Sequence, residues 1–482
     1  MSTLPKRMRR CVVWIGLCLL SVSGLSAREL FVVSTNPLAE PPYTNWIMAA
    51  TNIQNAINAA TNNDTIWISN GVYLLTNQIT LSSVSNNYML IRSVNGPEVT
   101  IIDANNYAGK PMTNRCLNIG SAGNNTFSGL TFANGRTTKP GGGVAFAQTT
   151  IISNCIFISN NCSGDGYGSL GGGLSGTNGI VKNSVFRDNL AEKGGGMYLW
   201  GTNFMISDCT ISNNFAIYFS GGISIHGTGV VVNCAISSNQ ALTYGGGIGI
   251  FAGAVISNCV INGNVATNTT TWENGGGIYF GGMNITVQNC TITENVAYRG
   301  GGIFYNQGNN STIRNCLISG NTAKLSGGGL FLYNHPVYTG LVESCTIVNN
   351  ASTNQGGGMK IEYNTTNRIY IVNTVVWSNR ATAASYPNIN DGDTNAFAYC
   401  SAPVNFFRPD AGNLTNDPLF AGPATGNWRL TPQSPCVNTG SNQAWMSDAH
   451  DFDGHSRIDK FSGRADMGAY EYLSQGTMYS MP

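Results

Sequence analysis

Apolar residues recur along this chain at the two-residue spacing of β-strands, within a phrase that is repeated nine times. In a clear copy, Ile256 stands three residues before Cys259, Ile261 two residues after it and Asn264 five residues after it, and a Gly-Gly-Gly run begins at Gly275. Residues two apart on a strand share a face, so Cys259 and Ile261 both point inward. The offset of three from Ile256 predicts a corner between two strands. The repeats lack the 3.6-residue periodicity of a helix.

The same positions form three columns through the middle of the chain. The first holds Cys155, Ser184, Cys209, Cys234, Cys259, Cys290, Cys316, Cys345 and Thr374. Five residues after each member stand Asn160, Asn189, Asn214, Asn239, Asn264, Asn295, Asn321, Asn350 and Asn379. The glycine column begins at Gly141, Gly171, Gly194, Ser220, Gly245, Gly275, Gly300, Gly327 and Gly356. A fixed repeat of this short length predicts a stacked solenoid rather than a propeller or helical hairpins.

The predicted fold is therefore all-β: a parallel β-helix with about three short strands per coil, and right-handed by the general chirality of parallel crossovers. Successive coils are expected to stack about 4.8 Å apart. The asparagines should form a buried ladder of amides, and the Asn or Asp before most column members should tolerate a left-handed bend. The thiols are interpreted as core packing, because Ser184 and Thr374 replace them and no His or CxxC spacing accompanies them.

The segments outside the repeats predict a division into four parts. Residues 1–27 combine basic residues, an apolar stretch and a small-residue cleavage site, which is typical of a secretory signal peptide, with an uncleaved anchor as the alternative. Residues 28–110 form an N-terminal cap and first coils, including an amphipathic helix at 53–60 that covers the open end of the core. Residues 111–380 form the repeats, and 381–482 form C-terminal coils and a capping region. We therefore expect export to the medium or the cell surface.

Composition argues against some binding partners, but it does not decide whether the cysteines outside the column form disulfides. Only 10% of the residues are charged and the net charge is +1, so nucleic acid is a poor candidate partner. No other apolar run is long enough to span a membrane, and a monomer is expected. Cys116, Cys162, Cys400 and Cys436 lie off the column, and a bridge between Cys400 and Cys436 is one possibility.

Several motifs resemble known families of exported bacterial proteins. The segment 53–73 resembles the N-terminal cap of right-handed β-helix proteins of the pectate-lyase-like superfamily. The Gly-Gly-Gly-Ile runs and 157–160 (Phe-Ile-Ser-Asn) resemble the repeats of polymorphic outer-membrane proteins. The motifs at 417–420, 427–430, 434–440, 451–457 and 464–472 together resemble the choice-of-anchor Q domain of surface β-helix proteins. The resemblance implies a right-handed β-helix at the cell surface or outer membrane.

The likeness to pectate lyases invites a search for their acidic site. Asp188 and Glu294 share one position within their coils but stand four coils apart, about 19 Å at the strand spacing. That separation is too large for a glycosidase pair or one Ca²⁺. His226 in Ile-His-Gly is a single echo of a polygalacturonase motif and is interpreted as structural. The repeats therefore predict no catalytic residues.

Two weaker sites are predicted. Asp451 and Asp453, in Asp-Phe-Asp-Gly, could bind Ca²⁺, although the further ligands of an EF-hand loop are missing, and a charged turn with either carboxylate paired to Arg457 is the structural alternative. Alternation along the strands after the glycines places two aromatic rows outward as a platform for sugar rings, or as ladders that stabilise the sheet beneath variable loops: Trp200, His226 and Phe251, and Tyr279, Phe304 and Phe331.

The leading prediction is a secreted or surface β-helix protein with a structural, adhesive or carbohydrate-contacting role and no catalysis, whose partners are polysaccharides or other cell-surface components. The competing class is a polysaccharide lyase or glycoside hydrolase. A third is an interaction scaffold in an envelope assembly. An acidic cluster on neighbouring coils would separate the enzyme from the other two.

Overall fold

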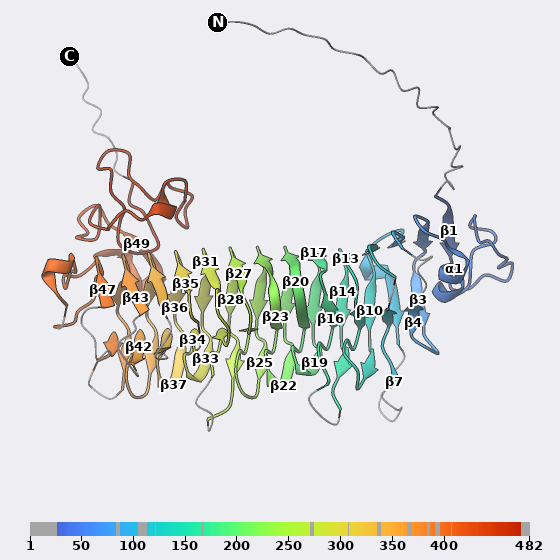
Figure 1. Cartoon of the computed structure of the whole chain (residues 1–482), viewed down its shortest axis with the longest axis horizontal. Helices are drawn as coiled ribbons and strands as arrows, with labels where there is room; N and C mark the ends of the chain where they lie inside the picture. The colour runs from blue at the N-terminus through green and yellow to red at the C-terminus, as the bar shows by residue number, and fades with distance from the viewer. Residues whose placement is uncertain are drawn as a thin grey trace, which may run out of the picture.

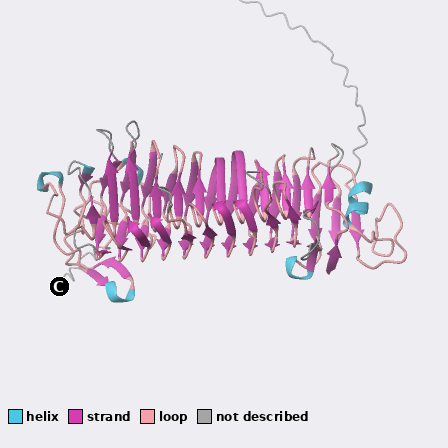
Figure 2. Ribbon diagram, turned by 90° about the horizontal axis from the view of Figure 1, so that it is seen from below, coloured by secondary structure: helices cyan, strands magenta, loops and turns pink. Residues whose placement is uncertain are grey.

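The computed structural model of the protein is a β-solenoid whose coils stack along one axis (Figure 1). It describes residues 27–82, 87–104, 113–120, 122–164, 168–269, 274–306, 308–334, 339–363, 369–382, 386–390, 396–405 and 407–473. The predicted signal peptide, 1–27, lies outside the described residues except for its last position. Figure 2 shows that the helical turns lie toward the two ends of the stack, as expected for an all-β core.

Each coil has three faces. One coil runs through β26 (Ile248–Ile250) and β27 (Ala254–Ser257), then β28 (Val260–Asn262), then β29 (Val265–Ala266). The first two strands belong to one parallel sheet, here called the first sheet; β28 belongs to the second sheet and β29 to the third. The two strands of the first sheet merge in β20 (Met197–Ser207) and β23 (Ile223–Val232). Three faces per coil are confirmed, but the first face usually holds two strands.

Left-handed residues make the corners of the coil. The residue before each column member has a positive φ, and so does the residue four positions after the member. The first residue of each glycine run is also left-handed, including Ser220 at φ 63°. At Gly275 an added Cβ would come within 2.3 Å of the Ile278 carbonyl oxygen, so this turn requires glycine. The fixed positions before and four residues after each column member therefore mark where the chain turns.

The predicted amide ladder is confirmed. Asn239 donates its Nδ2 and its backbone N–H to Oδ1 of Asn264, each at 3.0 Å, and Asn264 makes the same pair of bonds to Asn295. Each amide also donates to a carbonyl of the preceding coil, as Asn264 does to Ile236 at 2.9 Å. The ladder does not end at Asn379, because Asn388 accepts from it in the same way.

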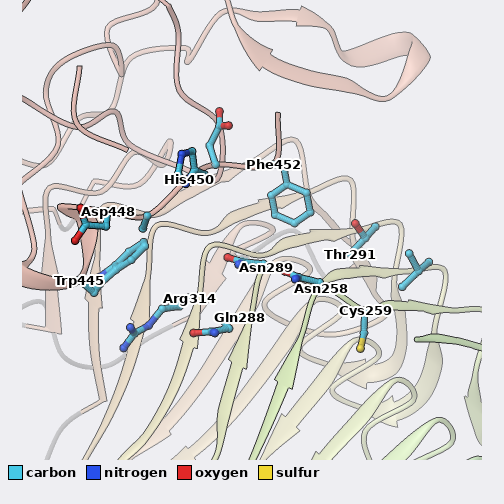
Figure 3. A pocket seen from close by; sticks show the side chains of 13 residues that line it. Asn258, Cys259, Gln288, Asn289, Thr291, Arg314, Trp445, Asp448, His450 and Phe452 are labelled. Carbon is cyan, nitrogen blue, oxygen red and sulfur yellow. The ribbon is translucent and has the colours of Figure 1, made fainter. Parts of the chain in front are cut away.

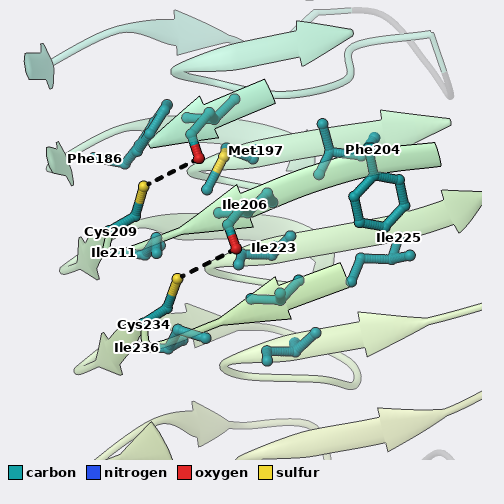
Figure 4. Close-up of a cluster of buried hydrophobic side chains, with 14 of the residues drawn as sticks. Phe186, Met197, Phe204, Ile206, Cys209, Ile211, Ile223, Ile225, Cys234 and Ile236 are labelled. Atoms are coloured by element: carbon teal, nitrogen blue, oxygen red, sulfur yellow. Dashed lines mark hydrogen bonds between the residues drawn. The ribbon is translucent and has the colours of Figure 1, made fainter. Parts of the chain in front are cut away.

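The cysteine column packs in the core, as predicted. In Figure 4, Cys209 and Cys234 point inward between Ile211, Ile206 and Ile236, and their thiols donate to carbonyls of the preceding coil at 3.7 and 3.9 Å. All eleven described cysteines are free and buried, so the possible bridge between Cys400 and Cys436 is not formed. Cys400 was placed off the column, but the register of Ile371 with Phe397 puts it beside Thr374 as the next member.

The N-terminal helix covers the first coil. α1 (Ile53–Ala59) buries Ile53, Ala56 and Ile57, and the side chain of Asn52 caps it by accepting from the N–H of Asn55 at 2.8 Å. The helix packs against β1 (Glu29–Val32), β2 (Thr65–Ile68) and β4 (Ile79–Leu81) of the first sheet. The predicted helix and its capping role are confirmed. Within the described residues, no helix is long and apolar enough to cross a membrane.

The C-terminal lobe, 417–473, lies along the flank of the second sheet (Figure 1). It contains β48 (Phe420–Gly422) paired antiparallel with β49 (Asn427–Leu430). Its Tyr470 and Trp428 pack on Val348 of β40 (Thr346–Val348), and Ala469 donates its N–H to the Thr346 hydroxyl at 2.9 Å. At the end of the core, Phe407 packs against Phe397, with ring centroids 5.3 Å apart. A cap over the last coil was expected, whereas the lobe covers a side.

Candidate functional site

The first aromatic row is only partly exposed. Trp200 is 53% exposed, but His226 and Phe251 are half-buried in a stack with Tyr198. Ring centroids lie 4.6 Å apart for Tyr198 and His226 and 4.3 Å apart for His226 and Phe251. Burial, with a smaller contribution from Lys193, lowers the pKa of His226 to about 4, so the ring is neutral near pH 7. This stack therefore stabilises the sheet, and Trp200 is the accessible residue of the predicted row.

The second row is buried, so its predicted exposure is wrong. Tyr279, Phe304 and Phe331 are 3%, 2% and 3% exposed, and they stack along β30 (Ile278–Phe280), β34 (Ile303–Tyr305) and β38 (Leu330–Asn334). Side chains that precede the glycine runs cover them. The ring centroids of Tyr244 and Tyr279 lie 4.4 Å apart, and the guanidinium carbon of Arg299 lies 5.9 Å from the ring centroid of Phe331. These rings are a structural ladder.

An open groove of about 790 Å³ lies beside Trp200 on the outer face of the first sheet. It crosses β8 (Leu117–Ile119), β12 (Val144–Phe146) and β16 (Leu174–Thr177), where the outward row holds Asn118, Ala145 and Ser175. These small side chains replace the aromatic rings of later coils, which is why the surface is hollow here. The polar lining is completed by Asn77, Gln78, Asn114, Arg115, Thr137, Thr138 and Lys139.

Arg115 has an unusual environment in this groove. It is only 7% exposed, and among the described residues its side chain makes one hydrogen bond, from Nη1 to Oδ1 of Asn118 at 3.2 Å. Its Nε has no hydrogen-bond partner among the described residues. Burial lowers the pKa of Arg115, with Cys162 opposing the shift. Arg115 carries no sequence signal of its own, because an isolated Arg in a loop belongs to no motif.

The carboxylates of the predicted calcium turn already accept hydrogen bonds from protein donors. Asp451 accepts three backbone N–H groups, those of Asp453, His455 and Glu471, at 2.7–2.9 Å. Asp453 forms a bidentate pair with Arg429 at 2.5 Å. The proposed structural alternative named Arg457 as the partner and is wrong. Arg457 instead pairs with Glu471, because both side chains are enclosed by the lobe.

We expect EDTA to leave the melting temperature of the protein unchanged relative to 1 mM CaCl₂. Three possible ligand atoms lie within 4.8 Å of one another, close enough to share an ion: a carboxylate oxygen each from Asp451 and Asp453, and a ring nitrogen from His455. However, a cation would have to displace Arg429 and the backbone donors. Differential scanning calorimetry measures the effect. A calcium-dependent rise that Asp453→Asn removes would contradict this expectation and establish the site.

A second groove, of about 650 Å³, lies between the lobe and the second sheet (Figure 3). Trp445 of η5 (Ala444–Met446) stacks with the Arg314 guanidinium at 5.1 Å, and Arg314 pairs with the buried Glu343 at 3.1 Å. Asn315 donates to the carbonyl of His450 at 3.0 Å. The charge of Arg314 is thus paired within the protein, and the Asn315 and Trp445 contacts join the lobe to the solenoid.

The strand register confirms that the acidic residues of the repeats are dispersed. Arg187, the neighbour of Asp188, lies on β18 (Val185–Arg187), and successive pairings lead through three further strands to Thr293, the neighbour of Glu294. The two carboxylates are therefore four coils apart. The described lining of the groove beside Trp200 includes no Asp or Glu. Its chemistry suits binding by amides, hydroxyls, one indole and two cations.

Comparisons with known proteins agree on the architecture. A family model described as "Right handed beta helix region" matches residues 116–270 and again 264–396, more than half of the chain. A search of curated proteins found no match.

Solved structures with a similar course include pectate lyase Pel9A, at 14% identity and TM-score 0.42, covering 93% of this chain and 98% of that one. The A-module of the mannuronan C-5 epimerase AlgE4 of Azotobacter vinelandii matches at 14% identity and TM-score 0.41, covering 70% and 92%. The Dettilon tailspike protein matches at 12% and TM-score 0.43, covering 71% and 68%. At these values their activities are not carried over to this chain.

Proposed function

The chain belongs to the right-handed β-helix family, and from that premise we propose that it is a carbohydrate-binding protein whose binding site is the groove beside Trp200. One observation carries the proposal: an exposed indole borders an open channel lined by amides and hydroxyls. Indole rings present an apolar face to the C–H face of a sugar, while amides exchange hydrogen bonds with its hydroxyls. The groove spans at least three coils, which suits a chain of several sugar units.

The proposed setting is outside the cell. A basic and apolar leader at 1–27 supports export, and the C-terminal motifs support a surface-associated β-helix. The role is adhesive or structural rather than catalytic. The groove has an aromatic residue and cations, but its described lining offers no carboxylate to act as acid, base or nucleophile.

Trp200→Ala should weaken binding of the preferred polysaccharide by at least about tenfold, because a Trp ring that becomes covered by the ligand buries a large apolar area, and Trp is enriched among residues that dominate binding energy. A glycan array identifies the ligand, and isothermal titration calorimetry measures the affinity of both proteins. Tyr370→Ala is the matched control, since Tyr370 is 50% exposed on β43 (Ile369–Val372) of the same sheet but remote from the groove.

Two results would contradict this function. Equal binding by wild type and Trp200→Ala, with Tyr370→Ala also unchanged, would place the ligand elsewhere. Release of unsaturated products or new reducing ends from a panel of uronic-acid and neutral polysaccharides would instead establish the lyase or hydrolase class.

A further inference from the structure

Arg115 interrupts the pattern of the solenoid. The pairing of Leu117 with Val144 places Arg115 beside Gly142, the middle glycine of a run. From Gly142 onward a side chain does not fit at this position, because a Cβ on Gly142 would lie 2.4 Å from the Gly172 carbonyl oxygen. Arg115 stands where the ladder of glycines begins, and its guanidinium lines the groove beside Trp200.

The charge of Arg115 has no counterion among the residues that the structure describes. No described carboxylate forms an ion pair with it, including Glu192, which shares Cys162 with Arg115 as a neighbour. A guanidinium that is more than nine-tenths buried without a charge partner is destabilising. The Nε of Arg115 adds to this cost, because it is buried with no hydrogen-bond partner among the described residues. Such an arrangement is expected where a ligand supplies the missing anion, since binding sites sacrifice stability for function.

We propose that Arg115 is an oxyanion-binding subsite that receives a carboxylate or sulfate group of the bound saccharide. A planar guanidinium whose Nε–H has no partner among the described residues matches both groups, and Lys139 in the same lining adds a second positive charge. The absence of Asp and Glu from the described lining removes electrostatic repulsion toward such a ligand. The inference rests on the proposed function, and it defines the class of saccharide: one that carries negative charge.

The test compares one polymer backbone in three charge states: dextran, carboxymethyl dextran and dextran sulfate. Each is titrated into wild type, Arg115→Gln, Trp200→Ala and Arg187→Gln by calorimetry. Arg187→Gln is the matched control, because Arg187 is an exposed arginine of the second sheet paired with Asp188 at 2.9 Å. Inorganic sulfate is titrated alone, to distinguish a free anion from one carried by a polymer. Thermal melts accompany every variant.

Arg115→Gln should weaken both charged polymers by about tenfold relative to dextran and should leave the melting temperature equal or higher, because an uncompensated buried charge is removed. Tighter binding of inorganic sulfate than of the polymers would assign the subsite to a free oxyanion. A selective loss with Trp200→Ala but not with Arg115→Gln would overturn the subsite and keep the proposed function. Unchanged binding in both variants would overturn both. A lower melting temperature with unchanged binding would make Arg115 structural and refute the subsite.

Discussion

Asn264→Ala should lower the free energy of unfolding by about 3–5 kcal/mol, because buried donors and acceptors that lose their partners each cost about 1–3 kcal/mol. Asn264 is fully buried, and its Oδ1 accepts both the amide and the backbone N–H of Asn239. Its Nδ2 supplies bonds to Asn295 and to the Ile236 carbonyl. Alanine removes all four bonds: the buried N–H of Asn239 loses its acceptor, and Asn295 Oδ1 keeps only the backbone N–H of residue 264.

Both the size and the location of the destabilisation by Asn264→Ala can be measured. Chemical denaturation measures the stability change, and hydrogen exchange should show faster exchange of the Asn239 amide, whose acceptor is gone. Asn262→Ala is the control, because Asn262 lies on the same coil, is half-buried, and bonds to the Thr293 hydroxyl on the outside. A loss no greater than that of the control would show that the ladder only accompanies the stacking of the strands.

Arg457→Met should release the C-terminal lobe. Removing one partner of a buried ion pair lowers the free energy of unfolding by about 3–5 kcal/mol. Arg457 is 0% exposed, lies 3.1 Å from the Glu471 carboxylate and donates to the Gly468 carbonyl at 3.0 Å. Without it, Glu471 keeps its charge in a nearly dry site or takes up a proton. Limited proteolysis should then cut the lobe while the solenoid stays protected.

The pH dependence of lobe stability follows from Glu471. Burial raises the pKa of Glu471, and Arg457 opposes the shift by stabilising the charged carboxylate. The folded lobe therefore holds the proton on Glu471 more tightly than the unfolded chain does, so the stability of the lobe falls as the pH rises through the range in which Glu471 ionises. Loss of Arg457 should steepen that fall.

The double variant Arg457→Met with Glu471→Gln should recover most of the stability, because no buried charge is left alone. Arg464→Met, an exposed position of the lobe, is the control. Equal proteolysis of Arg457→Met and Arg464→Met at pH 8 would refute the role of the ion pair in holding the lobe.

Much of the fold was predictable because it repeats. The inward Cys259 and Ile261, the asparagine ladder and the left-handed corners depend on contacts between identical positions of neighbouring coils, and a period in the sequence reveals such contacts directly. The N-terminal helix was predictable for a different reason: its apolar spacing and Asn cap are local properties of one segment.

The candidate site was predicted only in part. Alternation placed Trp200 and Phe304 outward with equal force, yet Trp200 is 53% exposed and Phe304 only 2%. Phe304 is covered because it stacks between Tyr279 and Phe331 in a buried aromatic cluster, whereas Trp200 lies outside that cluster. Strand periodicity specifies which side a residue faces, but it does not specify what covers that side.

The sequence by itself determined the coil, its corners, its core and its amide ladder, because these follow from short-range pattern and from repetition. Only the tertiary structure decided the partners of single, unrepeated residues. It paired Arg457 with Glu471 and Arg429 with Asp453, and it laid the lobe on the second sheet. It also buried Arg115, with no counterion among the described residues, in the groove that Trp200 borders. Such contacts join positions with no common spacing, so no pattern along the chain could reveal them.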